Sequence, residues 1–333
     1  MKRLMVFALV LMMIGAAAYG QARFPAKDVT ITVVFPAGGG TDVLNRLIAG
    51  EMRPFLGRNA VVTNVTGGVS ASNGMFHVWG LPHDGYNLAG MSESVVSGPV
   101  MGGFDKLMKA WYPFLIAGSP DVLSVPVSSP YKTLKDMVDA AKANPGTVKA
   151  GAGNVGGLHH LNMLAFQNGT GIKFNYIPYP GSGPTQTAAV TNEIDLVVTS
   201  LAEQQQLIKA GQLRPLGMLT NQSFKLEGFG EIPSSLKVYA GLKKYLPIMQ
   251  AIGFAVPDDT PADAKKVLDA AFKKAMKSAK VTEYMAQNYY QPIGQTGKEA
   301  VAIFNKLESL FCWTLWDLGQ AKVDPATLGI PKP

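Results

Sequence analysis

The chain has 333 residues, with 30 Lys and Arg against 23 Asp and Glu, a formal net charge of +7. This balance is only mildly basic and no block of Lys or Arg stands out, which argues against nucleic acid as a partner. It suits small anionic ligands weakly. The length exceeds what one hydrophobic core usually serves, so we predict two domains.

Residues 1–20 have the pattern of an export signal. Lys2 and Arg3 precede a short apolar stretch, and small residues lead up to Gly20. The apolar stretch is too short to span a bilayer comfortably. We therefore predict a soluble protein that is exported to the periplasm and cleaved near Gly20, rather than one held by a membrane anchor.

The segment VTITVVFPAGGGTDVL, at 29–44, predicts a strand, a glycine turn and the start of a helix. Apolar residues alternate with threonines over 29–33 as in a strand entering a buried sheet, and Pro36 ends it. Thr41 or Asp42 would cap the helix. The free N–H groups at such a helix start bind an anion, a carboxylate as readily as a phosphate. A tight turn without a ligand is the alternative.

Two more strands, at 60–65 and 86–91, give the strand–helix alternation of a parallel α/β sheet. Ligands of such sheets bind beyond the carboxyl ends of the strands, so we expect the segment 92–94 to lie beside the first glycine turn. Glu93 in this segment either faces solvent or meets an ammonium or hydroxyl group of a ligand.

The run 112–127 is long enough to leave one sheet and enter a second, and we place the first crossover there. A second α/β unit follows, with a glycine turn at 153–157 between a strand and a helix. A strand at 251–256 brings the chain back. The predicted domains are 21–122 together with 223–333, and 123–222.

Catalytic and metal-binding patterns are weak in this sequence. There is no G-x-S-x-G motif, and His159 and His160 point about 100° apart on a helix, which does not suit a shared metal. We predict no catalytic residue, metal or cofactor. An exported esterase or isomerase that uses His159 or Asp195 as a base is the alternative. Cys312, the one cysteine, is interpreted as a buried structural residue.

Six segments together resemble the exported solute-binding proteins of tripartite tricarboxylate transporters, the Bug family. They are FPAGGGTD at 35–42, HDGYNLAG at 83–90, AGNVGGLHHLNMLAF at 152–166, YIPYPGSGP at 176–184, EIDLVVTSLAEQQQLIKAGQLRPLGMLT at 193–220 and GFAVPDDTP at 253–261. The resemblance implies a type II periplasmic-binding-protein fold. In that fold, two α/β domains joined by two crossover segments close over a small carboxylate.

The resemblance also implies a site and partners. Backbone amides of both glycine turns would hold a di- or tricarboxylate, an amino acid or an aromatic acid, and the protein would act as a monomer. It would deliver the ligand to membrane subunits of the transporter, or alternatively present it to a membrane sensor kinase. The predicted ligand-binding residues are Pro36, Ala37, Gly38, Gly39, Gly40, Thr41, Asp42, Ser92, Glu93, Gly153, Asn154, Val155, Gly156, Gly157, His159, Ser182 and Asp195.

The sequence departs from the family pattern in three places. Tyr179-Pro180-Gly181 stands where Tyr-Lys-Gly is common, so a positive charge is missing. The stretch 250–253 stands where many relatives carry Trp-x-Gly, and Glu93 is unexpected at its position. We expect binding of an anion to persist, while these departures leave the rest of the ligand unidentified.

Overall fold

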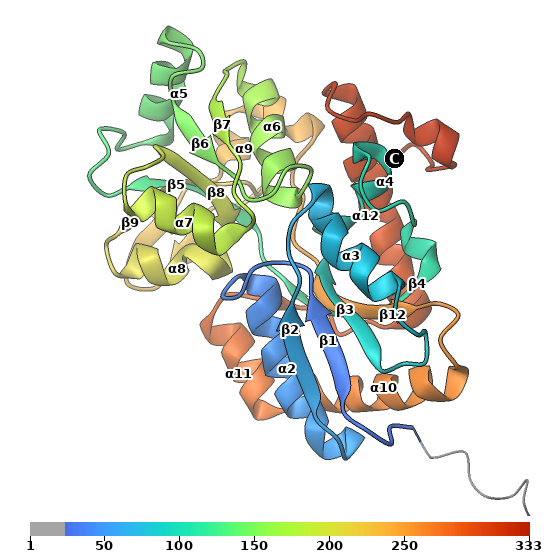
Figure 1. Ribbon diagram of the computed structural model, residues 1–333. Coiled ribbons are helices and arrows are strands. Elements are labelled where there is room, and N and C mark those ends of the chain that lie inside the picture. The colour runs from blue at the N-terminus through green and yellow to red at the C-terminus, as the bar shows by residue number, and fades with distance from the viewer. Residues whose placement is uncertain (1–23) are drawn as a thin grey trace, which may run out of the picture.

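The structure is a computed structural model that describes residues 24–333, so the predicted signal peptide lies outside the described residues. The described chain forms two α/β lobes, each built around its own sheet, with the second lobe drawn in green and yellow (Figure 1). None of the helices within 24–333 is long and apolar enough to cross a membrane.

The first lobe is built on a six-stranded mixed sheet in the order β13-β4-β12-β3-β1-β2. Its strands are β1 (Val29–Val33), β2 (Ala60–Asn64), β3 (Asn87–Ser92), β4 (Trp111–Gly118), β12 (Ile252–Pro257) and β13 (Gln291–Pro292). The first three strands run parallel, as the sequence predicts, and β12 lies antiparallel between β3 and β4. The helices include α2 (Gly40–Leu56), α3 (Ser72–Trp79), α4 (Gly98–Met101), α10 (Ala262–Ala275), α11 (Ala279–Gln287) and α12 (Gly297–Asp317).

The segment β1–α2 confirms the predicted strand, glycine turn and helix. Apolar side chains of β1 are fully buried, and Leu44, Ile48 and Met52 form the buried stripe of α2. The helix begins at Gly40, one residue before the predicted cap, and Gly39 is its N-cap without a side-chain hydrogen bond. Thr41 and Asp42 are therefore not caps, because both already lie within the first helical turn.

The two lobes are joined by adjacent crossover segments. Strand β4 ends at Gly118 and β5 (Asp121–Pro126) begins in the second sheet, which confirms the predicted first crossover. The return segment passes directly beside it, since the Gln250 N–H donates to the Ser119 carbonyl at 3.3 Å. A Cβ at Gly118 would lie 1.9 Å from the Gln250 carbonyl oxygen, so only glycine permits this approach.

The second lobe holds a five-stranded sheet in the order β7-β6-β8-β5-β9. Besides β5, its strands are β6 (Lys149–Gly151), β7 (Asn175–Ile177), β8 (Leu196–Ser200) and β9 (Leu213–Met218). The helices are α5 (Leu134–Ala143), α6 (Leu158–Thr170), α7 (Ser182–Val190) and α8 (Leu201–Lys209). Thr133 and Asp136 form a capping box of α5, and Ser200 with Glu203 forms one on α8.

The segment 224–244 lies on the second lobe. It comprises β10 (Phe224–Leu226), β11 (Gly230–Ile232), α9 (Ser235–Val238) and the 3₁₀ helix η4 (Ala240–Lys244). Both β11 and α9 contact β9, and η4 contacts α6. The prediction assigned all of 223–333 to the first domain, whereas these contacts favour a return to the first lobe just before β12. The exact division into domains otherwise stays a prediction.

Candidate ligand-binding site

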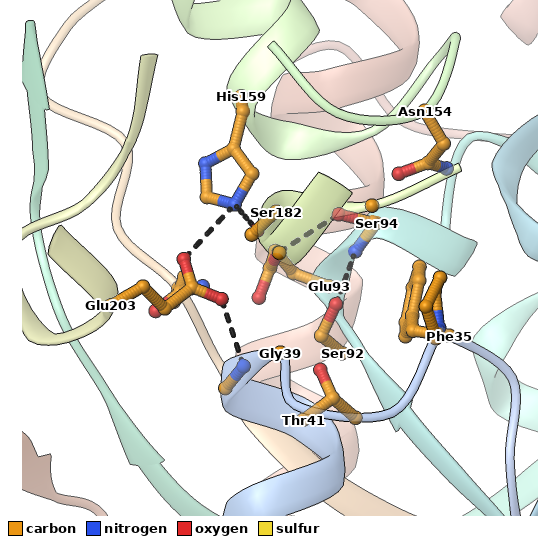
Figure 2. A pocket seen from close by; sticks show the side chains of 15 residues that line it. Phe35, Gly39, Thr41, Ser92, Glu93, Ser94, Asn154, His159, Ser182 and Glu203 are labelled. Carbon is orange, nitrogen blue, oxygen red and sulfur yellow. Dashed lines mark hydrogen bonds and ion pairs between the residues drawn. The ribbon is translucent and has the colours of Figure 1, made fainter. Parts of the chain in front are cut away.

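A cavity lies between the lobes, at the carboxyl ends of β1 and β3 and beside the starts of α6, α7 and α8 (Figure 2). The volume that the centre of a water molecule can reach in it is about 30 Å³, so in this conformation the lobes leave room for only a few atoms. It is lined by Phe35, Pro36, Gly39, Gly40, Thr41, Ser92, Glu93, Ser94, Asn154, His159, Gly181, Ser182, Gly183, Glu203 and Gln250.

The start of α2 forms the floor of the cavity. The N–H groups of Gly40, Thr41 and Asp42 lack acceptors within the helix because they belong to its first turn. The Gly40 N–H donates to Oε1 of Glu203, from the other lobe, at 2.9 Å. This donor thus holds a carboxylate of the protein itself, and binding of a ligand by the turn stays a prediction.

Not every predicted residue of the first turn reaches the cavity. Ala37, Gly38 and Asp42 do not line it. The Asp42 carboxylate accepts the Gly38 N–H at 3.0 Å and pairs with Arg46 at 2.9 Å. Asp42 therefore stabilises the turn without occupying the N–H groups at the start of α2.

The end of β3 contributes buried hydroxyl and carboxyl groups. Glu93 is only 1% exposed, which resolves the ambiguity left by the sequence in favour of the cavity. Its Oε2 accepts the Ala251 N–H at 2.5 Å, and its Oε1 accepts the Ser94 hydroxyl at 3.0 Å. Burial raises the pKa of Glu93, and the bond from Ala251 and the charge of His159 offset this only in part.

His159, in the first turn of α6, is held by acidic groups on both sides. Its Nδ1 lies 2.9 Å from both carboxylate oxygens of Asp121, and its Nε2 lies 3.6 Å from Glu203. Burial alone would lower the pKa of His159, but Asp121, Glu203 and Glu93 outweigh it and raise that pKa to about 9. The ring is therefore an imidazolium at neutral pH, with both N–H groups available as donors.

Asp121, His159 and Ser182 have the connectivity of a serine-hydrolase triad, with His159 Nε2 at 3.2 Å from Ser182 Oγ. A general base must be unprotonated at the working pH, and a histidine with a pKa of about 9 is not. Ser182 is also the first residue of α7, preceded by Gly181, and does not follow a strand on a nucleophile elbow. We interpret the arrangement as an oriented donor rather than a base.

The second glycine turn differs from the prediction. Several of its amides are bound by protein groups, among them the Gly156 N–H by His160 Nδ1 at 3.2 Å and the Leu158 N–H by Ser94 Oγ at 3.0 Å. Only Asn154 of the turn lines the cavity, whereas Gly153, Val155, Gly156 and Gly157 do not. The predicted second anion site is thus corrected, because His160 of the same lobe and Ser94 of the first lobe already bind these two N–H groups.

Asp195 also lies outside the cavity. It precedes β8, and its carboxylate accepts the Lys149 N–H at 2.8 Å. The cavity lies beyond the opposite, carboxyl end of that strand, where α8 begins. Its position before the strand was the signal that should have excluded it.

Three polar residues of the cavity were not predicted: Ser94, Glu203 and Gln250. The spacing of Ser200 and Glu203 indicates a capping box, and this box forms. That pattern does not predict that Oε1 of Glu203, the oxygen outside the capping box, accepts the Gly40 N–H. Gln250 lies in the return crossover and carries no motif.

The fold and the position of the cavity define a two-lobed ligand-binding protein. Among solved structures, the chain is similar to the periplasmic binding protein BugD, with a TM-score of 0.81, 22% identity, and 90% of this chain and 99% of that chain covered. It is equally similar to Rpa4515 of R. palustris, solved with adipate, with a TM-score of 0.81, 23% identity, and 90% and 99% covered.

Sequence comparison identifies the family. The model of the tripartite tricarboxylate transporter family receptor matches residues 44–306, and the chain belongs to this family. A curated relative, protein BugT of Bordetella pertussis, is 29% identical over 293 residues, which cover 84% of this chain and 85% of BugT. The predicted family and fold class are both confirmed.

Proposed function

We propose that this protein captures a small carboxylate in the cavity between its lobes, in the periplasm, for delivery to the membrane subunits of a tripartite tricarboxylate transporter. The observation that carries the proposal is the Gly40 N–H at the start of α2, which holds the Glu203 carboxylate at 2.9 Å. Glu203 uses the Gly40 N–H itself, so a carboxylate of the ligand would bind the neighbouring N–H groups of the same first helical turn. Relatives of the same fold include a protein solved with adipate and one with malate.

The remaining donors of the cavity suit the same ligand. The next amide of α2 belongs to Thr41, which lines the cavity together with Ser92. His159 adds an imidazolium N–H that Asp121 orients. Closure of the lobes excludes water, which strengthens each of these bonds.

Contacts between the lobes give closure a physical basis. The Ser97 hydroxyl donates to the Gly156 carbonyl at 2.6 Å, and the Ser70 N–H donates to the Val155 carbonyl at 3.1 Å. These bonds tie the second glycine turn to the first lobe. We propose that the turn acts as a latch for the closed form rather than as a ligand site.

The proposal is tested by a thermal-shift screen of the exported protein against mono-, di- and tricarboxylates, amino acids and aromatic acids. A ligand at about 100 times its dissociation constant should stabilise the protein by about 2.7 kcal/mol, which raises the melting temperature by several degrees. If no acid of the panel shifts the melting temperature of the folded protein, the proposal is contradicted. Turnover of a bound acid that is lost in Ser182→Ala would favour an enzyme.

Delivery is tested separately, because a sensor kinase would use the same closed form. The ligand-loaded protein should be captured with transporter membrane subunits from solubilised membranes of the native cell. Capture of a sensor kinase in their place would assign the protein to signalling.

A further inference from the structure

The charges of the cavity do not match a ligand that carries only carboxylates. Within the described chain, the ionisable residues that line it are Glu93, His159 and Glu203, and neither Lys nor Arg is among them. Asp121 lies directly behind His159. One imidazolium thus faces three carboxylates, and a second carboxylate on the ligand would find no free positive partner.

Among the described residues, two side chains that line the cavity have a buried polar atom without a hydrogen-bond partner: the Asn154 amide nitrogen, a donor that suits the carboxylate of the ligand, and the Gln250 oxygen, an acceptor. Gln250 is 6% exposed and lines the cavity, yet its side-chain oxygen has no hydrogen-bond partner. Glu93, 1% exposed, uses one bond on each oxygen, and a carboxylate can accept more. Buried acceptors of this kind require donors, which the ligand must bring.

The acceptors converge from both lobes. Figure 2 shows Glu93 and Glu203 pointing into the same space from opposite sides, with His159 above them. Glu93 follows β3 in the first lobe, and Glu203 starts α8 in the second. A cation between them would be bound only when both lobes are in place, because each lobe supplies one carboxylate.

We propose that the ligand carries a protonated nitrogen beside its carboxylate, as a small amino acid does, and that Glu93, Glu203 and Gln250 bind the ammonium group. The carboxylate of the ligand then lies toward the start of α2 and the His159 imidazolium. This inference rests on the proposed function and narrows its ligand class. In this inference, Glu93 and Glu203 determine the selectivity for amino acids over acids that lack nitrogen.

The test is calorimetric titration of the exported protein with matched pairs of acids. Each α- or ω-amino acid is compared with the acid of the same carbon skeleton without the amino group. One or more amino acids should bind at least about tenfold more tightly than their deaminated partners, since the loss of the ammonium leaves buried carboxylates unpaired.

Variants identify the responsible groups. Glu93→Gln should weaken binding of the preferred amino acid by about tenfold or more and reduce its advantage over the deaminated acid. Glu203→Gln keeps an acceptor for the Gly40 N–H and should act in the same direction. Glu308→Gln is the matched control, because Glu308 is a buried acid on α12 that accepts the Met108 N–H away from the cavity.

The outcomes separate this inference from the proposed function. Deaminated acids that bind as tightly as amino acids would overturn the inference and leave carboxylate capture standing. Unchanged amino-acid affinity in a folded Glu93→Gln would also overturn it, because Glu93 would then be an uncharged hydrogen-bonding group. Failure of every acid to bind would overturn the proposed function and the inference with it.

Discussion

The two glycine turns of this protein have the same local structure and different surroundings. Each follows a strand and precedes a helix, at α2 in the first lobe and at α6 in the second. The first presents its amides to the cavity, whereas the second has its amides and carbonyls bound by protein groups. We therefore expect a strand–glycine–helix motif to bind an anion only where the tertiary structure leaves its N–H groups uncovered.

The largest effect is expected for Gly156→Val. Gly156 has φ +82°, and a Cβ there would lie 2.6 Å from the Ser70 Oγ of the opposite lobe. Backbone strain and steric overlap together should lower the free energy of unfolding by about 4 kcal/mol, measured by urea denaturation. Gly146→Val is the matched control, because Gly146 has φ +78° but nothing within 4 Å, so it carries the strain alone. Equal losses in both variants would contradict a close contact between the lobes.

Gly39→Val should separate binding from stability in the first turn. Gly39 has an extended backbone, and its Cβ would approach only the Pro36 carbonyl, at 3.6 Å, while entering the cavity. We expect affinity to fall about a hundredfold or more, equivalent to about 2.7 kcal/mol, with little change in melting temperature. Gly50→Val, in open space on α2, is the control. Retained affinity would remove the first turn from the site.

His159, which follows the second glycine turn, is charged and lines the cavity. It should make the free energy of unfolding depend on pH. Its pKa is raised from 6.5 to about 9, so its contribution is complete below pH 6.5 and is lost as the pH rises through 9. The loss should be of the order of 2–3 kcal/mol. This loss of stability at high pH should be absent in His159→Gln. It should be preserved in His83→Gln, because His83 pairs with Asp259 outside the cavity. A slope that persists in His159→Gln would assign it to another group.

The smallest effect is expected for Ser94→Ala, which uncovers one amide of the second turn. The Ser94 Oγ accepts the Leu158 N–H and donates to Glu93. Its loss should cost about 1 kcal/mol of stability and weaken binding through Glu93. Thr133→Ala removes the cap of α5, away from the cavity, and should cost a similar amount with unchanged affinity. If the two variants bind equally well, Ser94 does not position Glu93.

Much of the fold was predictable because it depends on local patterns. The alternation at Val29–Val33 identified a buried strand, and the long run through Gly118 identified the crossover. The two neighbouring strand ends, β1 and β3, were correctly expected to bring the first turn and Ser92–Ser94 together. Parallel strand geometry follows from sequence order and needs no knowledge of side-chain contacts.

The cavity was less predictable because its acids come from distant segments. The contact of Glu203 with Gly40 spans 163 residues, and the only local signal at Glu203 is a capping box that explains it fully. Coverage of the second turn by Ser94 and Ser97 likewise depends on how the lobes meet. The strand that brings the chain back was predicted at 251–256 and forms as β12, whereas the contacts of 224–244 with the second lobe were not predicted, because this segment contains short elements without a strong period.

The paired crossovers also constrain how the lobes can move. Because Gly118 and Gln250 touch and the Gln250 N–H is bonded to Ser119, we expect the two connections to act as one pivot and not as two independent tethers. The relative motion of the lobes is then close to a single angle, and sliding of one lobe past the other would break this contact. One pair of fluorophores, on α10 and α8, would therefore read the whole opening coordinate, and the occupancy of the cavity could be followed as one distance.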